Sequence, residues 1–508
     1  MPDAIEDLDL VWFRRAARWH APVLDRTLPR LTRSANKSVL WLAIAAVLNL
    51  LGGRQGRRAA LRGLFAIGIT SFATNIPAKL FWRRTRPAID EVPHVRRLAR
   101  LPTSTSFPSG HAASAFAFAT GVALEKPAAG VPLLGLASVI AYSRVYVGVH
   151  YPSDVIAGAA IGAGMAIATR HLWPVTPDEP AQGRPEHVPV RERPEADGTG
   201  LSIVVNPTAG SGFGGPQTED LREALPGAEI IEIDEDLPLD EALEKAAASG
   251  RAIGICGGDG TVNAAAKVAL DAGKPLVVIP GGTLNHFARD IGVDSIDDVA
   301  DAIANGDTVG IDVGMIDGQP FLNTASFGSY VDLVDARERM ERKIGKWPAV
   351  VVALARVLRR GEPVYVDIDG DRRPVWMAFI GNCRYRPAGF TPSWRDRLDD
   401  GILDIRLVSA REPFARARLL WAVITGTLGR TAVYRCDLAG GPVEIRSMQG
   451  PVRLARDGET FSGSESFTIE KSSDRLVVFV PSSPTASSSS SAEPPSGASP
   501  RGASRARR

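Results

Sequence analysis

Three short polar clusters interrupt the apolar first third of the chain, and their residue types suit the binding of a phosphate group. In chain order they are Lys79 with Arg86, Ser109-Gly110-His111, and Arg144 with His150 and Asp154. Fixed Lys and Arg cations neutralise phosphate oxygens, and the free N–H groups at a helix start attract an anion. Ionisable residues at the ends of membrane helices are costly, so a functional role is the favoured interpretation.

The histidines in these clusters could perform the chemistry of phosphate transfer. His150 and Asp154 are four residues apart and so lie within reach on one helical turn. A carboxylate on one imidazole nitrogen leaves the other nitrogen free to attack. His111 is a second imidazole, suited to protonating a leaving oxygen.

The patterns KxxxxxxRP, PSGH and SRxxxxxHxxxD occur here in that order and resemble the type 2 phosphatidic acid phosphatase superfamily over about residues 38–173. The resemblance implies a phosphatase that needs no metal or other cofactor and forms a phospho-histidine intermediate. Haloperoxidases share the site with vanadate but are soluble, so they are the disfavoured alternative. The implied roles are nucleophile for His150, its orienting partner for Asp154, general acid for His111, and phosphate binding for Lys79, Arg86, Ser109, Gly110 and Arg144.

A second constellation lies in the C-terminal half, where three predicted strands each run into a glycine-rich turn. Such turns let backbone N–H groups approach phosphates, and three at successive strand ends favour a shared nucleotide crevice over ordinary turns. The Walker pattern GxxxxGK[ST] is absent from the sequence. The candidate nucleotide-binding residues are Asn206, Pro207, Thr208 and Gly210, then Gly257, Gly258, Asp259, Gly260, Thr261 and Asn263, then Gly282, Thr283 and Asn285.

NPTAGSG, GGDGTVN and GGTLN together resemble the diacylglycerol kinase catalytic domain over about 201–480. Sphingosine kinases and, more distantly, NAD kinases are its relatives. The resemblance implies two lobes with the active site between them, and the use of ATP and Mg²⁺. It implies Glu459 as catalytic base with Asp457 nearby, and Asp400 as a magnesium ligand beside main-chain oxygens of Arg397 and Ile402.

Two sequence features bear on what this second resemblance implies. The sequences around Asp400 and Glu459 are also good turn sequences, and only their position after the glycine-rich motifs favours function. Relatives often carry a glycine stretch after the Asn382-like position, where this chain has Arg384 to Phe390. That departure concerns the identity of the substrate more than the use of ATP.

At ~150 residues per domain, a chain of 508 residues is long enough for about three domains.

Five apolar segments could position the first site. Several of the five segments are rich in Gly and Ala, which suits close packing in lipid; the buried core of a soluble helical domain is the alternative. Residues 1–37 show no signal peptide and are expected to form an interfacial amphipathic segment, with a soluble surface helix as the alternative. The apolar segments are about 38–53, 59–81, 110–124, 130–149 and 154–173.

Charge placement predicts the sidedness of these segments. The basic connection 54–58 should be cytoplasmic, which puts 82–109 and the connection near 150 outside and everything after 173 inside. The arginines between Arg83 and Arg100 violate the rule, and a catalytic demand for cations would explain them. We therefore expect a multi-pass cell-membrane protein with its phosphatase site outside and its kinase domain in the cytoplasm.

The remaining segments complete a multi-domain fold class: an all-α membrane helical bundle, then an α/β nucleotide-binding lobe with a β-sandwich second lobe. The nucleotide lobe is expected at about 201–308 and the β-rich lobe at about 309–480. Residues 174–200 read as an extended linker and 481–508 as a disordered tail. Three widely spaced cysteines exclude a CxxC zinc site or disulfide scaffold.

The leading hypothesis is a bifunctional membrane lipid enzyme that hydrolyses a lipid phosphate or pyrophosphate and phosphorylates a diacylglycerol-like hydroxyl. The alternatives keep the phosphatase but direct the kinase to NAD or a polyol, or reduce it to a nucleotide-binding regulatory module. A net charge of +2 argues against a nucleic-acid partner. The expected partners are membrane lipids and ATP, and a homodimer is left open.

Overall fold

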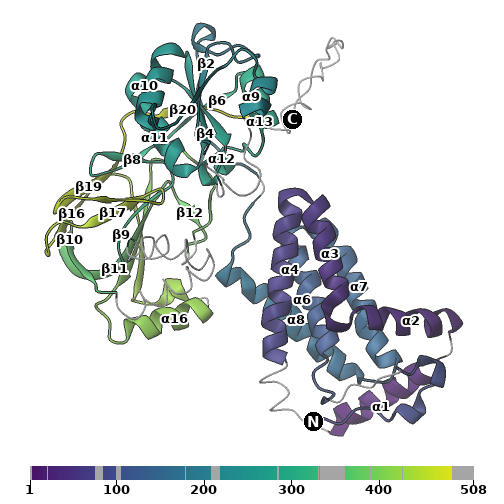
Figure 1. The fold of residues 1–508 in the computed structure, drawn as a ribbon. Coiled ribbons are helices and arrows are strands. Elements are labelled where there is room, and N and C mark those ends of the chain that lie inside the picture. The colour runs from purple at the N-terminus through teal and green to yellow at the C-terminus, as the bar shows by residue number, and fades with distance from the viewer. Residues whose placement is uncertain are drawn as a thin grey trace, which may run out of the picture. The chain divides into compact units, whose positions relative to one another are not determined.

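The computed structural model describes residues 3–19, 21–74, 84–98, 104–177, 179–207, 218–282, 285–329, 331, 361–388, 392–425 and 427–482. The chain divides into two compact units, one formed by residues 1–178 and one by most residues from 179 onwards (Figure 1). Each unit has its own hydrophobic core.

The N-terminal unit is helical, and α6 lies at its centre (Figure 1). Six of the nine buried residues of α6 are alanine or glycine, which allows neighbouring helices to approach closely. The helices are α1 (Asp3–Arg18), α2 (Pro22–Ser34), η1 (Asn36–Ser38), α3 (Val39–Leu51), α4 (Gly53–Ala73), η3 (Ile89–Glu91), η4 (His94–Arg96), α6 (Gly110–Glu125), α7 (Pro127–Tyr146) and α8 (Pro152–Leu172).

Two described helices, α7 and α8, are long and apolar enough to cross a membrane, and the bent pair α2–α3 would make a third span. α4 has 21 residues but carries four arginines, and α6 has 16 residues. The five apolar stretches expected from the sequence do form helices, although the second runs beyond the described residues. The basic segment 54–58 is not a connection, because it forms the first turns of α4.

A buried ion cluster ties α4 to the ends of α6 and α8. Arg62 is fully buried; its Nε donates to Glu125 Oε1 at 2.5 Å and its Nη2 to Pro174 O at 3.1 Å. Arg58 Nη1 donates to Thr176 O at 3.2 Å. The start of α4 and the chain leaving α8 therefore lie at the same end of the bundle.

The C-terminal unit contains a seven-stranded mixed sheet covered by helices (Figure 1). Its order is β1-β6-β20-β5-β4-β2-β3, in which β3, β2, β4, β5 and β20 run parallel. The strands are β1 (Arg184–Pro185), β2 (Leu201–Val205), β3 (Glu229–Glu232), β4 (Ala252–Gly257), β5 (Leu276–Pro280), β6 (Thr308–Ile311) and β20 (Leu476–Phe479). The helices are η5 (Val190–Glu192), α9 (Thr218–Ala224), α10 (Leu239–Ser249), α11 (Asp259–Ala272), α12 (His286–Asp290) and α13 (Ile296–Asn305).

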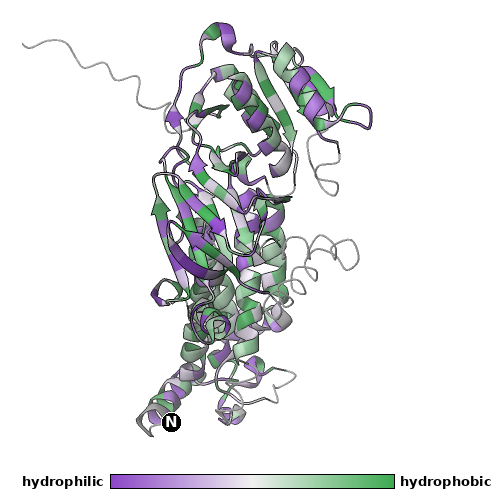
Figure 2. Ribbon diagram, turned by 90° about the vertical axis from the view of Figure 1, so that its left-hand side faces the viewer, coloured by the Kyte–Doolittle hydropathy of each residue, from purple (hydrophilic) through white to green (hydrophobic). Residues whose placement is uncertain are grey.

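The second layer is an eleven-stranded antiparallel sheet that curls around its own core. Its strands alternate between hydrophobic and hydrophilic residues (Figure 2), as one buried face requires. They are β7 (Gly314–Ile316), β8 (Gln319–Phe321), β9 (Thr324–Gly328), β10 (Val364–Ile368), β11 (Asp371–Asn382), β14 (Leu403–Ser409), β15 (Tyr434–Ala439), β16 (Val443–Ser447), β17 (Arg453–Arg456), β18 (Glu459–Ser462) and β19 (Ser466–Lys471). A small pair, β12 (Tyr385–Arg386) and β13 (Trp394–Arg395), α16 (Ala415–Thr425) and η6 (Leu428–Arg430) complete the described elements.

The fold class expected from the sequence is confirmed, but two boundaries differ. Residues 179–200 are not a free linker, because β1 pairs with β6 and Ala181 N donates to Asp290 O at 2.7 Å. The last predicted strand, β20, does not join the β-rich lobe but returns to the nucleotide lobe between β6 and β5. A buried apolar strand has the same sequence pattern in either sheet, so the pattern alone could not assign β20 to one of the two sheets.

Close packing of α6 on α8 gives a first prediction. A Cβ on Gly162 would overlap the carbonyl oxygen of Ala113, whereas nothing lies within 4 Å of a Cβ on Gly164. Gly162→Val should therefore lower the stability of the helical unit by about 1–3 kcal/mol, the usual effect of overpacking. The same substitution at Gly164 is the control, and thermal midpoints in detergent measure both. Equal midpoints would contradict this packing.

Candidate active sites

His150 lies buried in the short loop between α7 and α8, with a charged partner at each ring nitrogen. Its Nδ1 is 3.6 Å from Asp154 Oδ2, and its Nε2 is 3.4 Å from Arg86 Nη1. A carboxylate beside Nδ1 favours the tautomer that carries its proton there, which leaves the Nε2 lone pair free. Asp154 therefore lies beside His150, and its orienting role stays a prediction.

The Asp154 carboxylate is fixed by a network that the sequence did not reveal. It accepts hydrogen bonds from Tyr151 N at 2.8 Å, from Arg84 Nη1 at 3.0 Å and from Ser106 Oγ. Arg84 also donates to Asp9 Oδ2 at 2.8 Å. Arg84 stands in an arginine run and Asp9 in an acidic helix, so neither carried a signal that distinguished it from surface charge.

The predicted phosphate-binding arginines are held in place by neutral oxygens. Arg86 donates to Val149 O at 2.6 Å and to Ser104 O at 2.9 Å. Arg144 is buried and donates to Thr32 Oγ1 at 2.7 Å. Their positive charges are therefore not cancelled by carboxylates in these contacts, and they stay available to an anion.

Two buried polar atoms of this site, Ser109 Oγ and Arg144 Nε, lack a hydrogen-bond partner in the described part of the chain. Buried polar atoms are nearly always paired, so an unpaired set around one histidine indicates a place where a polar ligand completes the bonding.

The other residues predicted for this site are placed as follows. Ser109 N donates to Asp154 O at 2.9 Å, and Gly110 begins α6 directly after it. His111, in the first turn of α6, is 2.8 Å through Nε2 from Asn36 Oδ1. Lys79 lies outside the described residues.

The second candidate site is where β2, β4 and β5 end at the same edge of the parallel sheet. Asn206 N donates to Cys256 O at 3.0 Å, and Gly281 N donates to Gly257 O at 3.1 Å. A Cβ on Gly282 would lie 2.6 Å from Gly258 Cα, so these two turns can touch only as glycines. The described residues of the three predicted glycine-rich motifs therefore meet at one edge.

Further contacts join the motifs to each other and to the curled sheet. Asn206 Nδ2 donates to Thr261 Oγ1 at 3.4 Å, and Asn285 Oδ1 accepts from Gly282 N at 2.8 Å. Asn263 Nδ2 donates to Pro320 O at 3.0 Å. Pro207 follows β2 on the surface, and Thr208, Gly210 and Thr283 lie outside the described residues.

Glu459 lies directly over the glycine-rich turn that follows β4. A Cβ on Gly260 would overlap Glu459 Oε1, so the carboxylate of the curled sheet touches the start of α11. Asp259 on the same turn accepts from Phe287 N at 3.2 Å. Two residues predicted from motifs 200 positions apart thus share one site.

Asp457 has a structural task beside Glu459. Its carboxylate accepts from the backbone N–H groups of Leu322, Asn323 and Thr324 at 2.8–2.9 Å. Burial, together with the charge of Asp259, raises its pKa to about 6 even though the three N–H donors lower it. Asp457 therefore holds the start of β9 against the turn that carries Glu459.

Arg395 is a residue of this site that the sequence did not suggest. Its buried guanidinium pairs with Asp290 at the end of α12 and donates to Leu322 O at 2.7 Å and Asn382 O at 2.9 Å. Asp290 belongs to the nucleotide lobe and the two carbonyls to the β lobe. Arg395 therefore fastens the lobes together beside the site.

The loop predicted to bind magnesium has a carboxylate with acceptor capacity to spare. Asp400 accepts one backbone N–H on each oxygen, from Arg384 and Ile402, both at 2.9 Å. A carboxylate offers about four lone-pair sites, so oxygen ligands remain for a hard cation. Ile402 O already accepts from Cys383 N at 3.0 Å, and the Arg397 side chain pairs with Asp399.

Asp312 and Cys383 lie beside Asp400, and their ligand atoms are within 4.8 Å of one another. Lys471 Nζ lies 3.4 Å from Asp312 Oδ2, 3.3 Å from Cys383 Sγ and 2.6 Å from Asn382 Oδ1. Burial raises the pKa of the Cys383 thiol to about 12. A protonated thiol is a poor metal ligand and a neighbouring ammonium repels a metal cation, so Asp400 is the better candidate ligand.

The Asp457 contacts yield a second prediction. Its folded pKa of about 6 exceeds its ordinary value of 3.8, so between these values the folded state binds more protons than the unfolded state. The free energy of unfolding should fall as pH rises from about 4 to about 6, and then level off. Asp457→Asn removes this titration. The amide NH₂ group that replaces one carboxylate oxygen also faces a backbone N–H donor, which it cannot accept from.

The variant should therefore be less stable than wild type by a margin that narrows by up to about 3 kcal/mol as pH rises from 4 to 7. Thermal midpoints of both proteins at a series of pH values measure the margin. A margin independent of pH would show that Asp457 is ionised throughout.

Comparison with known proteins assigns a family to each unit. The sequence model of the PAP2 superfamily matches residues 59–176, and that of the diacylglycerol kinase catalytic domain matches residues 200–316. The "Probable lipid kinase YegS-like" of Pseudomonas syringae pv. tomato is 33% identical over 233 residues, covering 44% of this chain and 73% of that protein.

Two further similarities involve proteins of other bacteria. The diacylglycerol kinase of Bacillus subtilis is 31% identical over 161 residues, which are 30% of this chain and about half (53%) of that protein. The crystal structure of Aquifex aeolicus LpxE matches with 31% identity and a TM-score of 0.27, covering 32% of this chain and 93% of that one. The chain therefore belongs to two families, with a PAP2 superfamily domain at 59–176 followed by a diacylglycerol kinase catalytic domain at 200–316.

Proposed function

We propose that the chain is a bifunctional membrane enzyme. Its helical unit hydrolyses a lipid phosphate or pyrophosphate, and its C-terminal unit transfers phosphate from ATP to a diacylglycerol-like hydroxyl. The observation that carries the first activity is the buried His150, whose Nδ1 lies 3.6 Å from Asp154 Oδ2, beside the unpaired Ser109 Oγ and Arg144 Nε. The observation that carries the second is Glu459 lying over the turn at Gly260.

The phosphatase reaction follows from the placement of His150. Its free Nε2 attacks phosphorus while Arg86 and Arg144 neutralise the phosphate oxygens, and a phospho-histidine forms as the lipid oxygen departs. Asp154 stabilises the positive charge that develops on the ring. His111 supplies the proton to the leaving oxygen, and water then releases phosphate from the histidine.

The kinase reaction follows from the three turns and the facing carboxylate. Backbone N–H groups of the glycine-rich turns hold the nucleotide phosphates, and Glu459 accepts the proton of the lipid hydroxyl as it attacks. When bound, Mg²⁺ would neutralise the phosphate charge. Asp400 is the side chain that would hold a structural magnesium, with main-chain oxygens of Arg397 and Ile402.

The orientation that we propose places the kinase unit in the cytoplasm and the phosphatase site outside. Arg62 binds Pro174 O and Arg58 binds Thr176 O, so the basic start of α4 and the exit toward the kinase unit share one end of the bundle. Basic termini of membrane helices favour the cytoplasm. ATP is available on that side, which supports the assignment.

The role of His150 generates a third prediction. His150→Ala should abolish release of phosphate from phosphatidic acid in detergent micelles and leave ATP-dependent lipid phosphorylation intact, because the two sites lie in separate units. His171→Ala, at the other end of α8, is the matched control. EDTA should not reduce phosphate release, and undiminished release by His150→Ala would refute the assignment.

The role of Glu459 generates a fourth prediction. Glu459→Gln should keep ATP affinity and lose phosphoryl transfer by roughly 10²–10⁴-fold, the usual contribution of a general base. Radiolabel from ATP on diacylglycerol, prenols, NAD and polyols measures transfer and identifies the acceptor class. Glu470→Gln, an exposed change on β19, is the control. Near-normal transfer by Glu459→Gln would mean that the Asp457–Glu459 segment is only a turn.

A further inference from the structure

Two polar residues, one at the end of α2 and one just after it, contact two residues of the candidate phosphatase site. Thr32 Oγ1 accepts a hydrogen bond from Arg144 Nη1 at 2.7 Å. Four residues later, in η1, Asn36 Oδ1 lies 2.8 Å from His111 Nε2. Both residues precede the family domain at 59–176. One short stretch outside the sequence motifs therefore reaches both α7 and α6.

The Thr32 hydroxyl is placed to orient Arg144. Both side chains are buried, Thr32 fully and Arg144 to 2% exposure. A buried guanidinium is stable only where oxygens accept its N–H groups, and Thr32 supplies a neutral acceptor. Arg144 Nε, in contrast, has no partner in the part of the chain that the structure describes. One N–H group of the guanidinium is therefore held by α2 while another remains for a phosphate oxygen.

Asn36 is placed to orient His111 in the same manner. An amide oxygen only accepts hydrogen bonds, so this contact requires a proton on Nε2 of His111. The hydrogen bond at one ring nitrogen of a histidine determines the tautomer and the direction in which the ring points. Proton transfer to a leaving oxygen depends on that direction, because the proton must be aimed at the oxygen that receives it.

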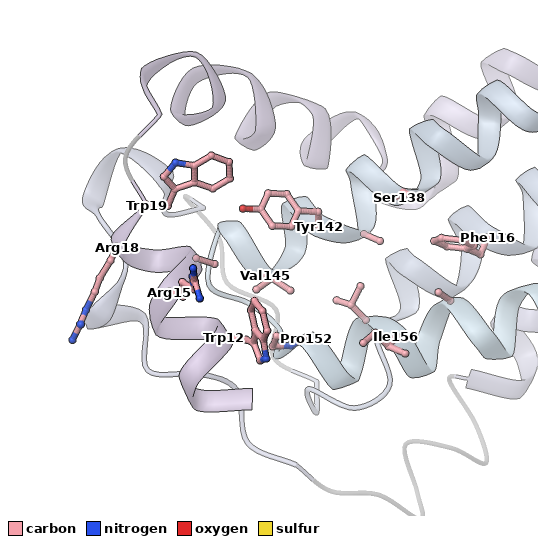
Figure 3. Close-up of a pocket in the computed structure, with 14 residues that line it drawn as sticks. Trp12, Arg15, Arg18, Trp19, Phe116, Ser138, Tyr142, Val145, Pro152 and Ile156 are labelled. Atoms are coloured by element: carbon pink, nitrogen blue, oxygen red, sulfur yellow. The ribbon is translucent and has the colours of Figure 1, made fainter. Parts of the chain in front are cut away.

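α2 is held against α7 by a second set of contacts at its start. Asp25 Oδ1 accepts from Arg96 Nε and from Tyr146 Oη, both at 2.5 Å. The Arg96 guanidinium lies 4.1 Å from the centre of the Tyr146 ring and also donates to Trp19 O. The Trp19 indole, just before α2, faces Tyr142 of α7 (Figure 3). The start of α2 is therefore fixed to α7 by groups other than those at its end.

We propose that Thr32 and Asn36 are positioning residues of the phosphatase site, Thr32 for Arg144 and Asn36 for His111. The proposal rests on the proposed phosphatase function and extends its site to α2 and η1. Thr32 acts on phosphate binding, because Arg144 meets the phosphate oxygens that every substrate presents. Asn36 acts on departure of the leaving group, because His111 protonates the departing oxygen.

The test of Thr32 uses the purified full chain in detergent micelles with dioleoyl phosphatidic acid and p-nitrophenyl phosphate. Thr32→Val removes the acceptor and keeps the side-chain shape, and Thr32→Ser restores the acceptor. Thr27→Val is the control, because Thr27 is exposed on the same helix and donates to Val23 O. Thr32→Val should raise KM for both substrates, and Ki for inorganic phosphate, by about tenfold, the effect of one hydrogen bond to a charged group.

Thr32→Ser should return these constants toward the wild-type values. A Thr32→Val protein with the KM and Ki values of Thr27→Val would overturn the role of Thr32.

The test of Asn36 compares leaving groups. p-Nitrophenolate departs without a proton, whereas the glycerol oxygen of phosphatidic acid needs one. Asn36→Leu should therefore lower kcat for dioleoyl phosphatidic acid by about tenfold and leave kcat for p-nitrophenyl phosphate nearly unchanged. Asn36→Asp keeps an acceptor and should lie closer to wild type, and Asn49→Leu, an exposed change on α3, is the control. Equal losses with the two substrates would overturn the role of Asn36.

A binding measurement separates this proposal from the phosphatase function. Inorganic phosphate should raise the thermal midpoint of wild type and of Thr32→Ser, and should raise that of Thr32→Val less. The same pattern without hydrolysis of either substrate by wild type would support the orientation of Arg144 by Thr32 and contradict the phosphatase function. Equal responses of the three proteins to phosphate would overturn the proposal.

Discussion

The arrangement around His150 depends on the buried carboxylate of Asp154. A buried carboxylate is stable only when its oxygens are paired, and here the partners come from Arg84, Ser106 and Tyr151. Each partner belongs to a different turn or to a segment between helices. Meeting this demand therefore brings the segment before α6 and the start of α8 into one arrangement, and His150 is positioned as a consequence.

In the kinase unit, buried charged groups also hold the candidate site together. Its two lobes are separate sheets, and charged side chains join the two lobes beside the glycine-rich turns. Arg395 spans from Asp290 to carbonyl groups of the β lobe, and Asp457 collects three backbone donors at the start of β9. Neither group needs to touch substrate, yet together they determine where Glu459 lies relative to Gly260.

The sequence predicted those parts of the site whose chemistry is local. Glycine-rich turns after β-branched strands identify phosphate loops because backbone approach demands glycine, and the histidine and aspartate of one helical turn identify each other by spacing. Asp9, Arg84 and Arg395 could not be recognised this way. Their partners are distant in sequence, and a charged residue in a charged run looks like ordinary surface.

The same limit explains the differences in the fold. The sequence order places β20 in the β-rich lobe, whereas it pairs with β6 and β5, because a buried strand of either sheet has the same apolar composition. The prolines and charges of residues 174–200 predict a linker, although β1 within this range pairs with β6. Prolines tolerate an edge strand, so composition alone does not exclude pairing.

The two candidate sites carry opposite charges. In the helical unit Arg86 and Arg144 contact neutral oxygens, so their cations would be available to the phosphate group that we propose binds there. In the kinase unit the turn after β4 carries the carboxylate of Asp259 and lies against the carboxylate of Glu459. An ATP phosphate placed there would be repelled unless a divalent cation neutralised it. Under the proposed function, the helical unit would therefore need no metal ion and the kinase unit would need one, for the same electrostatic reason.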